Sequence, residues 1–175
     1  MPLRLVALGQ RVAYRLSGGR FGSLEPAMAA PRGRALEIIT AVHRRVYRWT
    51  GGLLGGDAGG LPTLLLTTTG RKTGLARTVP LPYWPHPEGF AVVASFAGNP
   101  NNPAWYDNLV ARPEVEVQVK ARRFRAVARA AGPEERPAVW ASITAGAPMY
   151  ADYQRVTARE IPVVILRTLD EGAAG

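Results

Sequence analysis

One loop between two strand patterns, within residues 64–83, most constrains what this chain can fold into and bind. An apolar run at 64–66 leads into it, and apolar residues alternate out of it at 79–83, as expected for β-strands. Gly70 and Gly74 allow its backbone to take positive φ angles and to approach a ligand closely. Its cationic side chains are Arg71, Lys72 and Arg77. The pattern predicts a glycine-containing cationic hairpin loop.

The chemistry of this loop suits an anion. Successive exposed N–H groups in such a turn form an anion-binding concavity, and guanidinium and ammonium groups add charge-assisted donors for phosphate or carboxylate. The loop is not a P-loop, because the required glycine spacing before Gly-Lys-Ser/Thr is missing and no helix pattern follows. A solvated hairpin turn with the same glycine spacing is the alternative that the loop alone leaves open.

The net charge of +9 on 175 residues also favours an acidic partner. A chain of this length is expected to form one domain. It contains no cysteine, which excludes disulfides, thiolate catalysis and cysteine-ligated metals. The two histidines are isolated in the sequence, so we expect no metal site. Nucleic acid is not an expected partner, because the arginines are scattered without an aromatic-interleaved stripe. A cytoplasmic location is expected.

The first 33 residues are predicted to be a helical extension and linker, followed by the main domain at 34–170. Residues 3–16 form a basic amphipathic pattern, which can lie on an anionic membrane surface or dock on its own domain. Residues 1–20 are therefore a candidate contact with the inner face of the cell membrane. No segment has the roughly 20 apolar residues of a membrane-spanning helix, and no secretory signal is recognised. A further helix is expected at 34–50.

The rest of the chain favours an α+β fold, a small, partly open β-barrel with helices packed outside. Strands are predicted at 64–69, 77–84, 90–96, 115–119, 123–130 and 161–167. Pro80 and Pro82 indicate an edge or a bulge in the second strand. Asn102 is expected to cap a short helix that has Pro103 at its first position. Further helices are predicted after 132–135 and at 149–160.

Several of these segments together resemble the deazaflavin-dependent nitroreductase family. They read LLTTTGRKTGLAR at 65–77, VPL at 79–81, VAS at 93–95, NPAWYDNL at 102–109, YADYQ at 150–154 and REIPV at 159–163. The resemblance spans about residues 46–168. It implies a split β-barrel of the FMN-binding split-barrel type and the use of coenzyme F420, with FMN the less expected cofactor. F420 carries a phosphate and a glutamate tail, which suits the basic loop.

The resemblance also implies a cofactor site. In the family, the loop holds the phosphate and the start of the tail, while the segment at 95–98 and the helix at 105–108 line the deazaflavin ring. The matching residues are Thr69, Gly70, Arg71, Lys72, Thr73, Gly74, Arg77, Thr78, Tyr83, Ser95, Phe96, Ala97, Gly98, Trp105 and Asn108. Trp105 is expected on or beside the ring and Asn108 at its polar edge. Core packing is the alternative for Trp105.

Tyr150 and Tyr153 match family positions that border the substrate pocket. Three residues apart, they share one face if the segment is helical. We predict Tyr150 as the proton donor or substrate clamp, with Tyr153 beside it. Packing at the barrel mouth is the alternative for both. A phenol with a pKa of about 10 gives up its proton only to a strongly basic product anion.

The resemblance implies an oxidoreductase that transfers a hydride from reduced deazaflavin to an electron-poor conjugated acceptor. Departures from the family bear on that acceptor. Residues 145–148 read AGAP where a tyrosine is common, and Phe96 stands where a polar or basic residue is frequent. A wide, apolar pocket follows, which favours quinones or enones over any one nitro compound. A non-catalytic F420 carrier and a basic membrane-surface module are the alternatives.

Overall fold

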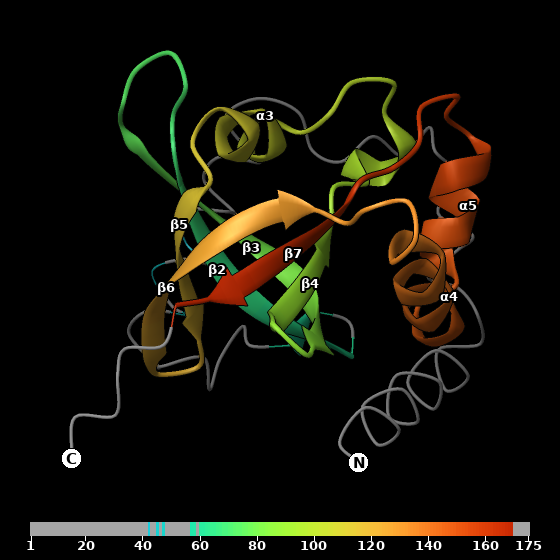
Figure 1. Ribbon diagram of the computed structural model, residues 1–175, viewed down its shortest axis with the longest axis horizontal. Helices are drawn as coiled ribbons and strands as arrows, with labels where there is room; N and C mark the ends of the chain where they lie inside the picture. Colours follow the sequence, from blue (N-terminus) through green and yellow to red (C-terminus); the bar gives the residue numbers. More distant parts are fainter. Residues whose placement is uncertain (1–41, 43–44, 46, 48–56, 59, 170–175) are drawn as a thin grey trace.

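The computed structural model describes residues 42, 45, 47, 57–58 and 60–169 of the chain (Figure 1). The predicted extension at 1–33, its membrane-binding helix and the domain boundary after residue 33 lie outside the described residues. Most of the helix expected at 34–50 does so as well. Within the described part of the chain, no helix combines the length and apolarity needed to cross a bilayer.

Six antiparallel strands, β2 to β7, form a barrel, and the two-residue strand β1 pairs with β2 alone. The sheet order is β1-β2-β3-β4-β7-β6-β5, and a further pairing of β2 with β5 closes the barrel. The strands are β1 (Asp57–Ala58), β2 (Leu61–Thr69), β3 (Ala76–His86), β4 (Gly89–Val93), β5 (Glu114–Val119), β6 (Arg122–Ala130) and β7 (Val163–Thr168). Three residue pairs make the closure, for example Leu66 with Val117. The barrel is thus closed between β2 and β5 rather than partly open.

Strand alternation divides the apolar residues between two cores. One core fills the barrel and includes Leu64, Leu66, Val92 and Val117. The helix α3 (Ala104–Ala111) contributes Trp105 and Leu109 to the same core. In Figure 1 this helix lies across the upper end of the barrel, beside the protruding β2–β3 loop. It therefore acts as a plug for that end.

The second core lies outside the barrel. The helices α4 (Arg136–Gly146) and α5 (Met149–Arg155) stand together at one side of the sheet in Figure 1. They pack on the outward residues of β4 and β7, among them Val93 and Ile165. Helices packed against the outside of a barrel are what the strand and helix pattern predicts.

Several predicted boundaries are wrong. β2 begins at Leu61 rather than 64, β3 ends at His86 rather than 84, and β7 begins at Val163 rather than 161. The third strand ends at Val93 rather than Phe96, because Phe96 and Ala97 have positive φ angles of 48° and 51° and turn the chain out of the sheet. The helix predicted at 149–160 ends at Arg155. Asn102 makes no cap bond to α3; its side-chain oxygen accepts a hydrogen bond from Arg159 instead.

The two prolines of β3 lie where this strand pairs with β2 alone, so they mark a local edge, although β3 as a whole lies between β2 and β4. The register with β4 begins only at Tyr83. Pro80 and Pro82 pair with Leu65 and Thr63 of β2, and both precede the register with β4. Because no strand pairs with them on the β4 side, the N–H that proline lacks costs no hydrogen bond there.

Truncation of a barrel side chain should cost far more stability than truncation in the loop. Leu66 is fully buried in the barrel, whereas Leu75 is 60% exposed. We expect Leu66→Ala to lower the free energy of unfolding by about 2–5 kcal/mol. The control Leu75→Ala should change it by less than about 0.5 kcal/mol. Chemical denaturation measures both, and similar losses would contradict the assignment of Leu66 to the core.

Candidate cofactor site

The β2–β3 loop has an ordered backbone. The Gly70 N–H donates to the Leu75 carbonyl at 2.8 Å, and the Gly74 N–H donates to the Gly70 carbonyl at 2.7 Å. Gly74 has φ +69°, in the left-handed region that glycine adopts without strain. A Cβ on Gly70 would lie 2.9 Å from Thr73 Oγ1 and 3.1 Å from the Leu75 carbonyl oxygen. Both glycines are therefore needed for the loop's shape.

Asn108 fixes this loop to the plug helix. Its Oδ1 accepts the Arg71 backbone N–H at 3.0 Å, and its Nδ2 donates to Thr68 Oγ1 at 3.2 Å. The Asn108 side chain is buried, with only 7% of the residue exposed. Asn108 was predicted at the polar edge of the cofactor ring, and in this structure both ends of its amide bind the loop and the strand before it.

The loop's cations differ in what they contact. The Arg71 guanidinium pairs with Asp107 at 3.2 Å, with both side chains more than a third exposed. The side chains of Lys72 and Arg77 are exposed. Four loop N–H groups are used within the protein, those of Gly70, Arg71, Gly74 and Leu75. Among the hydrogen bonds of the described residues none uses the N–H of Lys72 or Thr73, which leaves two successive donors in the loop.

The predicted threonines and Tyr83 divide between the loop and the barrel. Thr67 and Thr78 share a hydrogen bond between their hydroxyls at 2.9 Å across β2 and β3, and Thr69 is half-buried at the start of the loop. Tyr83 lies seven residues along β3, roughly 23 Å from Ala76. Its ring packs edge-on against Phe90 at 5.1 Å inside the barrel. The structure does not bring Tyr83 to the loop.

The second predicted segment, residues 95–98, forms an unusual turn. The short 3₁₀ element η2 (Phe96–Gly98) has three successive positive φ angles, of 48°, 51° and 75°. Phe96 is 48% exposed, and Ala97 is exposed too, whereas Gly98 is buried. A Cβ on Gly98 would clash with Val156 and lie 2.9 Å from the Tyr153 carbonyl oxygen. The turn therefore packs directly against the end of α5.

The three aromatic residues predicted for the ring and the substrate differ in burial. Trp105 is 7% exposed and belongs to the barrel core. Tyr150 is 4% exposed and packs edge-on against Trp84 at 5.5 Å. Tyr153 is half-buried, with its ring 5.9 Å from that of Tyr150. Trp105 and Tyr150 thus sit in separate cores, and of the two tyrosines Tyr153 is the more accessible.

Burial also affects the acidity of the two phenols. Desolvation raises the pKa of Tyr150 well above its ordinary value, and the neighbouring Tyr153 adds to this. The pKa of Tyr153 is raised as well, first by burial and then by the negative charge of Asp152. Both phenols therefore stay protonated at neutral pH and can donate hydrogen bonds.

Sequence reasoning missed Arg159 as a site residue. Its guanidinium donates to the carbonyls of Ala94, Ser95 and Asn99 and to Asn102 Oδ1, at 2.7–3.1 Å. These acceptors flank η2. Arg159 stands in the segment at 159–163 that carries the family resemblance, but an arginine that binds backbone carbonyls leaves no distinct pattern in a sequence.

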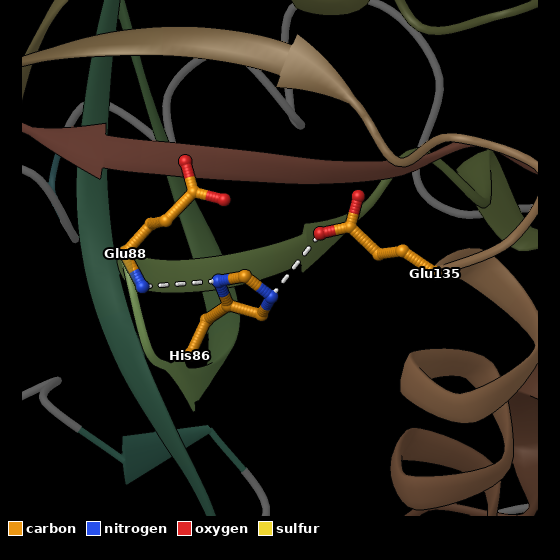
Figure 2. A group of neighbouring side chains, drawn as sticks. All are labelled: His86, Glu88 and Glu135. Carbon is orange, nitrogen blue, oxygen red and sulfur yellow. Dashed lines mark hydrogen bonds and ion pairs between the residues drawn. The ribbon is translucent and has the colours of Figure 1, made fainter.

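A third group of charged residues lies at the other end of β3. His86, Glu88 and Glu135 place their ligand atoms within 4.8 Å of one another (Figure 2). His86 Nδ1 accepts the Glu88 N–H, and its Nε2 lies 3.3 Å from Glu135 Oε1. Arg129 donates two hydrogen bonds to Glu135, at 2.6 and 2.9 Å, and one to Glu88. The guanidinium already binds both carboxylates, which favours a structural tie between the β3–β4 turn, β6 and the start of α4 over a metal site.

The closed antiparallel barrel, plugged at one end by α3, places this chain in the class of split-barrel proteins. Residues 40–168 match the family model F420H(2)-dependent quinone reductase. The chain belongs to this family. It is an oxidoreductase that uses reduced F420.

The relatives agree with this family. An F420H(2)-dependent quinone reductase of Mycobacterium tuberculosis H37Rv is 40% identical over 132 residues, which cover 73% of this chain and 89% of that protein. A solved F420-H2 dependent reductase, FDR-A, is 42% identical with a TM-score of 0.54, and the match covers 60% of this chain and 93% of that one. Another solved chain, described as a domain-swapped dimer, is 36% identical with a TM-score of 0.57, over 74% of this chain and 97% of that one.

The cluster around Arg129 makes stability depend on pH. Its hydrogen bonds lower the pKa of Glu135 from 4.5 to about 2. The folded pKa is depressed, so this stabilisation is complete above about pH 4.5 and is lost as pH falls towards 2. We expect Glu135→Gln to cost about 1 kcal/mol at pH 7, allowing for solvent screening, and to flatten the acid limb of the unfolding curve. Glu134→Gln, at an exposed neighbour, is the control; equal acid limbs in both variants would contradict this.

Proposed function

We propose that the chain reduces quinones, or other electron-poor conjugated acceptors, with the F420 tail and phosphate held by the β2–β3 loop. The observation that carries this proposal is the fixed loop, which presents Lys72, Arg77 and two unused backbone N–H groups at the plugged end of the barrel. When bound, reduced deazaflavin supplies a hydride. The chain's own residues bind the cofactor, place the acceptor and supply or relay a proton.

The loop residues fit a polyanion. The charge of Arg71 is partly balanced by Asp107, whereas Lys72 and Arg77 remain exposed with no acidic partner among the described residues. The N–H groups of Lys72 and Thr73 add two neighbouring donors. Because Asn108 holds the backbone in place before any ligand arrives, binding needs little further ordering of the loop. Lys72, Thr73 and Arg77 are therefore the proposed phosphate and tail ligands, with Arg71 in support.

The ring and acceptor are proposed to lie between η2 and α5. Phe96 is an exposed apolar side chain on a turn that packs against α5, and Tyr153 is half-buried on that helix. An apolar wall of this kind suits a quinone. A quinone that gains a hydride also needs one proton, and Tyr153 is better exposed than Tyr150 to orient the developing oxyanion or to relay that proton. Tyr150, packed on Trp84, would then set the position of Tyr153.

Charge removal at the loop tests the proposal, and the chain's two lysines, Lys72 and Lys120, offer a matched pair. Both are exposed, and Lys120 lies in the β5–β6 turn, away from the loop. We expect Lys72→Gln to raise the dissociation constant for F420 about five- to tenfold, with the difference shrinking at high salt. Lys120→Gln should leave the dissociation constant unchanged. Fluorescence titration measures binding, and reduction of menadione by F420H2 measures activity.

Two results would contradict the proposal. Equal binding by wild type and Lys72→Gln at low salt would remove the loop from the cofactor site. Tight F420 binding without turnover of menadione, an enone or a nitro compound would favour a carrier over a reductase.

A further inference from the structure

Arg159 makes four hydrogen bonds to one short stretch of chain. Its Nε donates to the Asn99 carbonyl at 2.8 Å, and its Nη1 donates to Asn102 Oδ1 at 2.9 Å. Its Nη2 donates to the carbonyls of Ala94 and Ser95, at 3.1 and 2.7 Å. A planar guanidinium offers five N–H donors in a fixed fork, and four hydrogen bonds to one segment define that segment's position.

These acceptors need a partner because the sheet ends beside them. β4 stops at Val93, and the last bond of this ladder runs from the Ala94 N–H to the Pro162 carbonyl at 2.9 Å. Beyond it the chain leaves the barrel, and the carbonyls of Ala94 and Ser95 accept hydrogen bonds from Arg159. A buried carbonyl without a donor is costly, so Arg159 replaces the missing strand.

The segment that Arg159 holds is also strained. Phe96 and Ala97 occupy the left-handed region, which side chains with a Cβ rarely adopt, and Gly98 follows with φ +75°. The turn keeps only two internal backbone bonds, from the Gly98 N–H to Ser95 and from the Asn99 N–H to Phe96, both at 3.0 Å. Such a conformation persists only where its surroundings determine it, and it often marks a functional site.

Arg159 is itself held by α5. Gln154 donates to the Arg159 carbonyl at 2.8 Å and accepts the Ile161 N–H at 2.9 Å. The same helix carries Tyr153, whose backbone contacts Gly98. The chain therefore joins α5 to the turn twice, once through the packing of Gly98 and once through Gln154 and Arg159.

We propose that Arg159 is a positioning residue that sets the strained turn at Phe96–Gly98 against α5, and so fixes how Phe96 and Tyr153 are placed relative to each other. The proposal rests on the proposed function for its effect on ligands, because the ring and acceptor are placed between these two elements. Its effect on the turn itself does not depend on any ligand. Arg159 touches neither cofactor nor acceptor in this account.

Arg136 provides a matched control. It is also a partly buried arginine, which donates to the Ile161 carbonyl at 3.0 Å and pairs with Glu160 at 3.1 Å, so it binds the chain just after Arg159. Its guanidinium lies over Trp140 of α4, 5.0 Å from the ring centre, and not against the turn. Arg159→Met and Arg136→Met thus remove similar groups, and Arg159→Lys keeps the charge without the fork. Asn102→Ala removes only one of the four acceptors of Arg159. It is the variant to measure if Arg159→Met does not fold.

Amide hydrogen exchange of the protein without ligand is the first measurement. We expect Arg159→Met to speed exchange at Gly98 and Asn99 at least about tenfold, with Arg159→Lys and Asn102→Ala intermediate and Arg136→Met unchanged. Unchanged exchange at these amides in Arg159→Met, or an equal increase in Arg136→Met, would overturn the proposal.

Steady-state kinetics with F420H2 and menadione form the second measurement. Arg159→Met should raise KM for menadione by about ten- to a hundredfold, while F420 affinity conferred by the loop changes less. Complete rescue by Arg159→Lys would indicate a purely electrostatic role and would overturn the proposal. If the wild type neither binds F420 nor reduces menadione, the proposed function fails, and the exchange result still decides the role of Arg159.

Discussion

The hydrogen bonds of the buried Asn108 amide are the interaction on which the proposed cofactor site depends. The amide joins three elements with two hydrogen bonds: the plug helix α3, the end of β2 at Thr68 and the backbone of the loop at Arg71. Loss of such a buried bond leaves polar groups unpaired and costs about 1–3 kcal/mol. The amide also sets the loop in place relative to the barrel, so that the proposed binding of a ligand by Lys72 and Arg77 would cost little further entropy.

The proposed binding residues and the Arg129 cluster lie at opposite ends of the barrel. One end carries the plug, the cationic loop and the strained turn, and these leave charged and apolar side chains exposed. The cluster around Arg129 lies at the other end of β3, where one guanidinium binds two carboxylates within the protein. Strain at the turn is tolerable because rigid elements surround it, with α5 on one side and the end of the β4–β7 ladder on the other.

Much of this architecture could be predicted from the sequence. Alternation in Val115, Val117 and Val119 predicts a strand with one buried face, and Gly70 and Gly74 predict a hairpin loop, both as found. Such patterns are local, and each is set by the backbone of a few residues. The end of β4 could not be predicted this way, because Phe96 favours a strand and only the contacts of Arg159 and α5 hold it in a left-handed turn.

Side-chain contacts were harder to predict from the sequence than strands and loops. Asn102 has the sequence context of a helix cap, yet Arg159, 57 positions away, uses its oxygen. Tyr150 and Tyr153 look equivalent at a spacing of three, but the packing of Trp84 on one of them separates a buried phenol from an accessible one. Such choices depend on residues that the fold brings together from distant positions.

Amide hydrogen exchange at Arg71, compared with Thr73, tests most directly whether the loop is fixed before the cofactor binds. Both residues are exposed, but only the Arg71 N–H has a buried acceptor, Asn108 Oδ1. We expect the Arg71 amide of the ligand-free wild type to exchange at least about tenfold more slowly than that of Thr73, and the difference to vanish in Asn108→Ala. Equal exchange at the two amides in the wild type would contradict the account.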